Sequence, residues 1–117
     1  MPLISFSGKS SQGSFYQQIL DGKKTQTCRK PRKHPIKKGD ILYLYWKCRV
    51  PKNKKPIHFI GEAVCIEVER QHYKDFAYLN YFAKCDGFRD HLELQEWFGD
   101  PISCGMEEYD VISFKLK

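Results

Sequence analysis

Residues 57–70 have the sequence IHFIGEAVCIEVER, which predicts one long strand with an irregularity in its middle. The apolar side chains expected to face inward change their alternation at Gly61: before it they are Ile57 and Phe59, and after it Val64, Ile66 and Val68. A change of face at a glycine is typical of a β-bulge or of a corner at which a sheet bends. This stretch therefore predicts a curled sheet or a barrel.

Shorter elements lie on both sides of this strand in the sequence. Strands are predicted from short apolar or alternating runs at residues 2–6, 25–29, 41–46 and 109–116. Helices are predicted from apolar residues at helical spacing: residues 14–20, the stripe Phe76, Leu79, Phe82 and Ala83, and the group Leu94, Trp97 and Phe98. Residues 7–14 are expected to form a loop, and Gly99 and Pro101 are expected to end the last helix. Together these elements predict a small α+β domain.

The size and composition of the chain predict one soluble domain. With 117 residues, the chain is expected to form a single domain over residues 1–117 and to be a monomer. No apolar run approaches the roughly 20 residues that cross a bilayer, and no secretory signal is present, so a cytoplasmic protein is expected. The five cysteines contain no C-x-x-C pair and the four histidines are scattered. We therefore expect reduced cysteines, no metal ion and no cofactor.

Positive charge is concentrated in the first half of the chain. Residues 1–60 contain 14 of the 20 lysines and arginines but only two acidic residues, a formal charge of +12, whereas residues 61–117 carry −6. This polarity favours a polyanionic partner; the alternative is that the two halves attract each other after folding. Candidates for contacts with phosphates lie in two basic loops: Lys30, Arg32, Lys33, Lys37 and Lys38, and then Lys52, Lys54 and Lys55. Nearby aromatic residues could stack on bases or belong to the core: Tyr43, Tyr45 and Trp46.

A dense group of polar residues occupies positions 22–29, which have the sequence GKKTQTCR. Gly22 allows the backbone to turn with positive φ after the predicted helix. On the strand that follows, Thr27 and Arg29 share one face, and Lys24 is close enough to the turn to reach the same side. Because cationic donors and a hydroxyl suit a phosphate or a base edge, Gly22, Lys23, Lys24 and Arg29 are candidate nucleic-acid-binding residues.

The same segment resembles the G-x-K-x-x-[E/T]-x-R signature of the ASCH domains, a family of the PUA-like superfamily. The matching residues are Gly22, Lys24, Thr27 and Arg29. Further similarity comes from Lys-Lys-Gly-Asp at residues 37–40 before an apolar strand, and from Asp-Gly-Phe at residues 86–88 before a helix that ends in Trp97-Phe98. The resemblance implies a PUA-like pseudobarrel of five or six strands, with helices covering one side and a central cleft. It also implies a role in RNA metabolism, with RNA or a nucleoside as the partner.

The resemblance also implies roles for single residues. Some small ASCH proteins are amidohydrolases that cleave N4-acetylcytidine, and in them the catalytic set corresponds to Lys24, Thr27 and Asp86. The chain has Asp86 where those proteins carry a glutamate, and Asp86 could instead cap the helix that follows it. Arg29 could contact a ligand or pair with Glu62 or Asp86. The leading interpretation is an RNA- or nucleoside-binding domain; the alternatives are an amidohydrolase and a ribonuclease, so enzymatic activity is left open.

Overall fold

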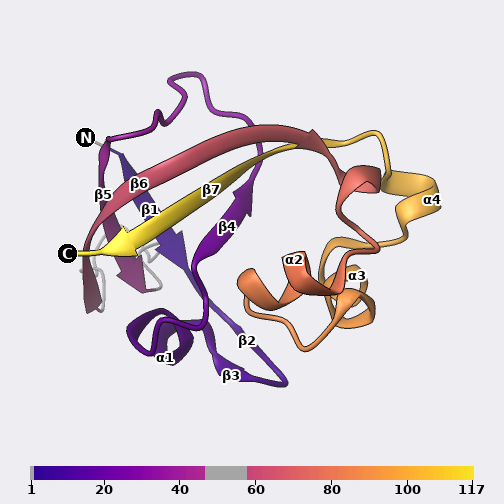
Figure 1. Ribbon diagram of the computed structural model, residues 1–117, viewed down its shortest axis with the longest axis horizontal. Coiled ribbons are helices and arrows are strands. Elements are labelled where there is room, and N and C mark those ends of the chain that lie inside the picture. The colour runs from indigo at the N-terminus through magenta and orange to yellow at the C-terminus, as the bar shows by residue number, and fades with distance from the viewer. Residues whose placement is uncertain (1, 47–57) are drawn as a thin grey trace, which may run out of the picture.

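A strongly curled, mixed five-stranded sheet dominates the computed structural model, which describes residues 2–46 and 58–117 (Figure 1). The strands lie in the order β1 (Leu3–Phe6), β5 (Ile41–Trp46), β6 (His58–His72), β7 (Glu108–Leu116) and β4 (Gln26–Arg29). β1 runs parallel to β5, and the other neighbours are antiparallel. The predicted α+β class is confirmed: the sheet forms a half-barrel and is accompanied by short helices.

The remaining elements connect the strands. They are the hairpin β2 (Lys9–Ser10) and β3 (Gly13–Ser14), α1 (Phe15–Leu20), the 3-10 turn η1 (Tyr73–Asp75), α2 (Asn80–Cys85), α3 (His91–Phe98) and α4 (Pro101–Cys104). Ser14 caps α1 by accepting a hydrogen bond from the Gln17 backbone N–H at 3.1 Å, as expected for a helix that begins there. In the described part of the chain, no helix is long and apolar enough to span a membrane.

Two local predictions about these elements are wrong. Residues 7–14 contain a short hairpin instead of only a loop. The helix expected from Phe76 begins at Asn80; Phe76 is buried ahead of it, and Leu79 is 52% exposed. Gly99 and Pro101 follow the end of α3 as predicted, but Pro101 also begins a short helix that was not predicted, α4, in the first-turn position that suits proline.

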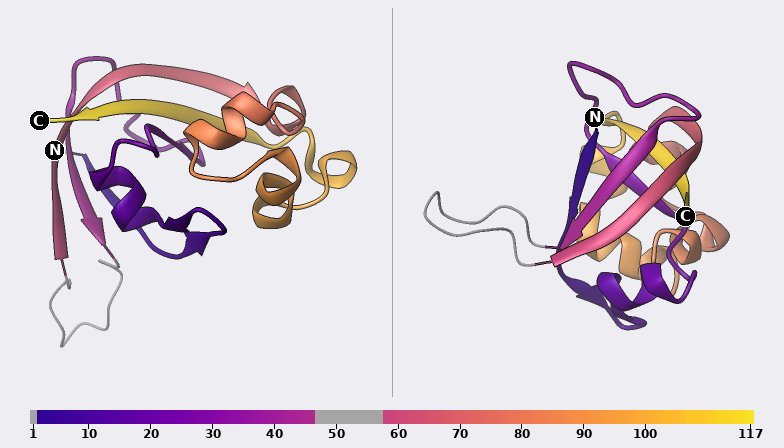
Figure 2. Two further views of the ribbon diagram at one scale, coloured as in Figure 1. Left: turned by 60° about the horizontal axis from the view of Figure 1, so that its bottom comes forward. Right: turned by 90° about the vertical axis from the view of Figure 1, so that its left-hand side faces the viewer.

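β6 contains the irregularity predicted at Gly61. Leu44 pairs with Gly61 and the next residue of β5 pairs with Phe59, so Ile60 is the extra residue of a bulge. A second irregularity follows between Cys65 and Glu67. These bulges let one long strand bend enough for the sheet to curl, as the end-on view shows (Figure 2).

Two of the residues predicted to face inward on β6, Phe59 and Ile66, are wrong, whereas Val68 packs against the core as predicted. Ile57 lies outside the described residues. Phe59 and Ile66 are about half exposed, whereas Ala63 and Cys65 are fully buried. Each bulge shifts the alternation of side chains by one residue, so the sequence pattern alone gives the wrong face. Ala63 and Cys65 pack inside the curl, in the same cluster as Leu42 and Phe114.

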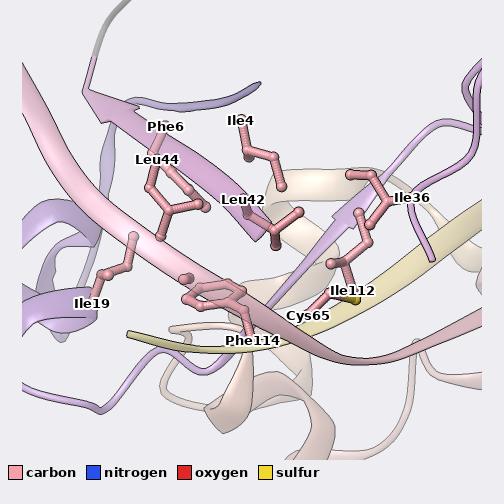
Figure 3. Packing of buried hydrophobic residues seen from close by; sticks show 10 residues of the cluster. Ile4, Phe6, Ile19, Ile36, Leu42, Leu44, Cys65, Ile112 and Phe114 are labelled. Carbon is pink, nitrogen blue, oxygen red and sulfur yellow. The ribbon is translucent and has the colours of Figure 1, made fainter. Parts of the chain in front are cut away.

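Two hydrophobic clusters hold the fold together. The first fills the inside of the curl, with residues of β1, β5, β6 and β7 around Leu42 and Phe114 (Figure 3). The second lies between the other face of β7 and the helices, where Val111 and Tyr109 pack among residues such as Phe76 and Leu94. Consequently the N-terminal half of β7 is buried on both faces.

Candidate functional site

A cavity of ≈150 Å³ lies where the two edge strands of the sheet approach the helices. It is lined by residues from β1, α1, β4, the α2–α3 connection and α3: Ser5, Phe6, Ser7, Phe15, Lys24, Thr27, Cys28, Arg29, Asp86, Phe88, Trp97 and Phe98. The cavity therefore brings together Lys24, Thr27 and Asp86, the three residues predicted to be catalytic, and includes Arg29.

Lys24 reaches the cavity from the turn that follows α1. Gly22 has a φ of +75°, which reverses the chain as expected after the helix. The Lys24 side chain is 5% exposed, and its Nζ donates hydrogen bonds to the Asp86 carbonyl at 2.5 Å and to Asp86 Oδ1 at 3.3 Å. The same ammonium lies 4.7 Å from the centre of the Phe15 ring. Lys24 is thus a buried cation held between a carboxylate and an aromatic face.

Asp86 ends α2 and directs its carboxylate into the protein. Its backbone N–H caps the helix by bonding to the carbonyls of Phe82 and Ala83. Burial raises the pKa of Asp86 above its usual range, and the nearby Lys24 opposes this shift. The side chain that caps α3 is Asp90, which accepts a hydrogen bond from the Glu93 N–H at 3.0 Å. The Asp86 side chain is therefore directed to Lys24 and not to a helix terminus.

Thr27 and Arg29 form a second polar pair in the cavity wall. Arg29 Nε donates a hydrogen bond to Thr27 Oγ1 at 3.0 Å, and its Nη2 donates to the Ser5 carbonyl at 2.6 Å. The guanidinium also lies 4.9 Å from the centre of the Phe6 ring. Because Thr27 Oγ1 accepts from Arg29, its own proton remains to be donated elsewhere. Arg29 therefore orients the Thr27 hydroxyl and at the same time joins β4 to β1.

Cys28 adds a buried thiol to this group. Burial raises the pKa of Cys28 well above its usual range, and the adjacent Asp86 carboxylate raises it further. A thiol must lose its proton to act as a nucleophile. Cys28 is therefore a hydrogen-bond donor to Asp86 and not a reactive thiolate.

In the part of the chain that the structure describes, the basic residues predicted to bind nucleic acid lie outside this cavity, apart from Lys24 and Arg29. Lys30 pairs with Glu107 at 2.8 Å, and Arg32 Nη2 donates to the Leu3 carbonyl at 2.8 Å. Lys30 is exposed, as are Gly22, Lys23, Lys33, Lys37 and Lys38. Lys37 and Lys38 line a separate hollow beside Arg70. Lys52, Lys54 and Lys55 lie outside the described residues.

The aromatic wall of the cavity was not predicted as part of a site. Phe6, Phe15, Phe88 and Trp97 line it, although the sequence pattern placed Phe15 and Trp97 only on the apolar stripes of helices. The one available signal was the Asp-Gly-Phe and Trp-Phe pairing of the ASCH resemblance. The rings become neighbours only through the tertiary fold, with Phe15 and Trp97 centroids 5.3 Å apart.

The described residues contain no group of three or more His, Cys, Asp or Glu side chains that could hold a metal ion. The chain matches no model of a known protein family, no curated protein and no solved structure.

Proposed function

We propose that the chain binds a nucleobase, carried by a nucleoside or by an RNA strand, in the cavity between β1, β4 and α3. The observation that carries this proposal is the buried Lys24–Asp86 pair, 3.3 Å apart, in a cavity whose walls include five aromatic rings. Flat aromatic walls suit a planar ring, and a few fixed polar groups at the end of an apolar cavity give it orientation.

The polar groups match the chemistry of a base edge. Asp86 supplies an acceptor, while Lys24 and the free proton of Thr27 supply donors. A base presents donors and acceptors side by side on its Watson–Crick edge. At ≈150 Å³ the cavity is smaller than the roughly 300–1,000 Å³ typical of drug-sized ligands, so it fits a single ring system and not an extended ligand.

We also propose that the chain is a divergent ASCH domain of the PUA-like superfamily that acts in RNA metabolism. The support is that three of the four matching residues of the signature, Lys24, Thr27 and Arg29, line one cavity in a curled sheet. In this proposal the exposed lysines at residues 33–38 would contact phosphates if the ligand is RNA.

Binding is tested by calorimetry with the four ribonucleosides and by filter binding with single-stranded and structured RNA over a salt series. We expect saturable binding that Lys24→Ala weakens about tenfold or more, because a buried charge contact to the ligand is lost. Lys23→Ala is the matched control, since Lys23 is exposed and outside the cavity. Absence of binding to every nucleoside and RNA would remove the proposal.

A second candidate function is hydrolysis of an acylated nucleoside such as N4-acetylcytidine. The observation that favours it is the presence of a hydroxyl, Thr27, in the same cavity as the Lys24–Asp86 pair. In such a reaction the Thr27 oxygen attacks the acyl carbon and the Thr27 hydroxyl loses its proton. The Lys24–Asp86 pair transfers this proton to the amine, which departs as the amide C–N bond breaks. Water then releases the acyl group from Thr27 as a carboxylic acid.

Hydrolysis is tested by incubating the protein with N4-acetylcytidine and separating cytidine by chromatography. We expect turnover that falls by at least about a hundredfold in Thr27→Val, which keeps the shape of the side chain but removes the nucleophile. Turnover that persists in Thr27→Val, or no turnover in the unaltered protein, would exclude this candidate and leave base binding as the function.

A further inference from the structure

A second hollow of ≈460 Å³ adjoins the cavity and shares two of its wall residues, Phe88 and Trp97. The rest of its lining comes from the β2–β3 hairpin and from α3: Lys9, Ser10, Ser11, Glu93 and Glu96. The two spaces therefore have Trp97 and Phe88 as a common wall. The first holds aromatic rings and the Lys24–Asp86 pair, and the second holds hydroxyls, two carboxylates and Lys9.

Trp97 is held in a fixed position although 51% of it is exposed. Its ring lies edge-on to Phe15, with centroids 5.3 Å apart, and 5.9 Å from the Phe88 ring. Gly8 lies directly against it: a Cβ at Gly8 would be 2.9 Å from Trp97 Cη2, and the φ of Gly8 is +87°. A large, half-exposed ring that is immobilised by its neighbours can stack on a ligand at little entropic cost.

The second hollow has acceptor groups and more negative than positive charge. Glu93 is fixed in place because its Oε1 accepts from the Arg89 N–H at 2.9 Å and its Oε2 from the Ser11 N–H at 3.0 Å. Glu96 is exposed on the next turn of α3. Carboxylates accept hydrogen bonds from hydroxyl groups, and they repel phosphates.

We propose that the two spaces form one bipartite site, in which the ring of the ligand stacks on Trp97 and an uncharged, hydroxyl-bearing group occupies the second hollow. This inference rests on the proposed base-binding function and narrows it. The ligand is then a free ribonucleoside whose sugar hydroxyls face Glu93 and Glu96. A phosphate attached to that sugar would lie beside both carboxylates and is disfavoured.

The experiment uses a Trp46→Phe protein, in which Trp97 is the sole tryptophan. Its fluorescence is titrated with the four ribonucleosides, and calorimetry is run in parallel. The best ligand is then compared with its 2′-deoxy form, its 5′-monophosphate and a single-stranded RNA of the same base. We expect the nucleoside to quench the fluorescence of Trp97. The affinity for the monophosphate is expected to be about tenfold lower than the affinity for the nucleoside. Trp97→Ala is expected to reduce nucleoside affinity about five- to 150-fold, the range for loss of one stacking contact.

Charge in the second hollow is tested by Glu96→Gln, with Glu69→Gln as a control because Glu69 is exposed on β6, away from both spaces. Glu96→Gln is expected to reduce the difference in affinity between the nucleoside and the monophosphate. Glu69→Gln is expected to leave this difference in affinity unchanged. The inference is overturned if the monophosphate or the RNA binds as tightly as the nucleoside or more tightly. It is also overturned if calorimetry detects nucleoside binding but the fluorescence of Trp97 is not quenched. Failure to detect any binding by calorimetry removes the base-binding function and this inference together.

Discussion

Lys24 and Asp86 form a buried pair whose two charges depend on each other. The Lys24 ammonium opposes the burial that raises the pKa of Asp86. Removing one partner of such a pair typically costs about 3–5 kcal/mol, because the other charge stays buried without compensation. The two side chains that we propose contact the ligand therefore also stabilise the fold.

Lys24→Met is expected to lower the free energy of unfolding and to make it more dependent on pH. Without the ammonium, the pKa of Asp86 rises further above its ordinary value of 3.8. A carboxyl group with a raised pKa in the folded state stabilises the protein at low pH, and this contribution is lost as the pH rises. Urea unfolding between about pH 4 and pH 8 should show that the free energy of unfolding declines more steeply with pH in Lys24→Met than in the unaltered protein.

The control for this experiment is the double variant Lys24→Met/Asp86→Asn, in which the titrating group is absent. In this double variant the free energy of unfolding should depend on pH no more strongly than in the unaltered protein. Lys23→Met, at the exposed neighbouring position, should change neither the free energy of unfolding nor its dependence on pH. Parallel pH curves for Lys24→Met and the unaltered protein would show that the two side chains are not coupled.

Cys28 is expected to be the least reactive of the described cysteines on the helix side of the fold. Its pKa is raised well above the usual range by burial and by Asp86, whereas Cys85 and Cys104 are half-buried. At about pH 8, alkylation by iodoacetamide should therefore modify Cys28 at least about tenfold more slowly than Cys85. Peptide mass spectrometry after timed alkylation measures this. Equal rates would mean that Cys28 forms a thiolate and would reopen its candidacy as a nucleophile.

At the scale of elements, the end of α3 is joined to the end of β6 by one buried tyrosine. Tyr73, in η1, is fully buried, and its hydroxyl donates to the Gly99 carbonyl at 2.6 Å. Burial raises the pKa of Tyr73 to about 12. This contact fixes the helix that carries Trp97 relative to the sheet.

Tyr73→Phe is expected to cost about 1 kcal/mol of stability near neutral pH, because one hydrogen bond is lost. A group whose pKa is raised on folding contributes stability below its unfolded pKa, here 10.0, and loses it as the pH approaches about 12. Urea unfolding should therefore show that the difference between the two proteins shrinks over this pH range. A difference that stays constant would indicate that the Tyr73 hydroxyl does not titrate differently in the folded state.

At the scale of the whole molecule, arginine side chains bridge the two edges of the curled sheet. Arg29 of β4 donates to Ser5 of β1, and Arg32 donates to Leu3 of the same strand. β1 and β4 are the outermost strands and are not paired with each other in a backbone ladder. Side-chain bridges in place of a ladder leave room between the edges for the cavity.

Arg29→Met should therefore destabilise the protein more than Arg32→Met does. Arg29 makes a charge-assisted bond to Ser5 and another to Thr27, and each such bond contributes about 1.5–3 kcal/mol. Arg32 has a bond to Leu3 on the exposed side of the sheet, where the expected loss is about 1 kcal/mol or less. Urea unfolding of the two variants measures the difference. Equal losses would mean that Arg29 has no special role in joining the edges.

The sequence by itself determined the order of most elements and several of their boundaries. β5 begins and ends where predicted, Ser14 caps α1, and Gly22 makes the turn before β4. The bulge beside Gly61 was also predictable. These features depend on short-range physics, namely side-chain alternation, capping and the backbone freedom of glycine, which neighbouring residues in the sequence reveal.

The tertiary structure decided what each residue faces. Lys24 and Asp86 are 62 positions apart, and only the packing of α2 against β4 brings them within hydrogen-bond distance. Contact between α1 and α3 likewise turns Phe15 and Trp97 from helix-stripe residues into neighbours in one cavity wall. The bulges of β6 exposed Phe59 and Ile66 and buried Ala63 and Cys65, because one extra residue shifts the phase of a strand. Burial depends on contacts between distant segments, so no local pattern could have supplied it.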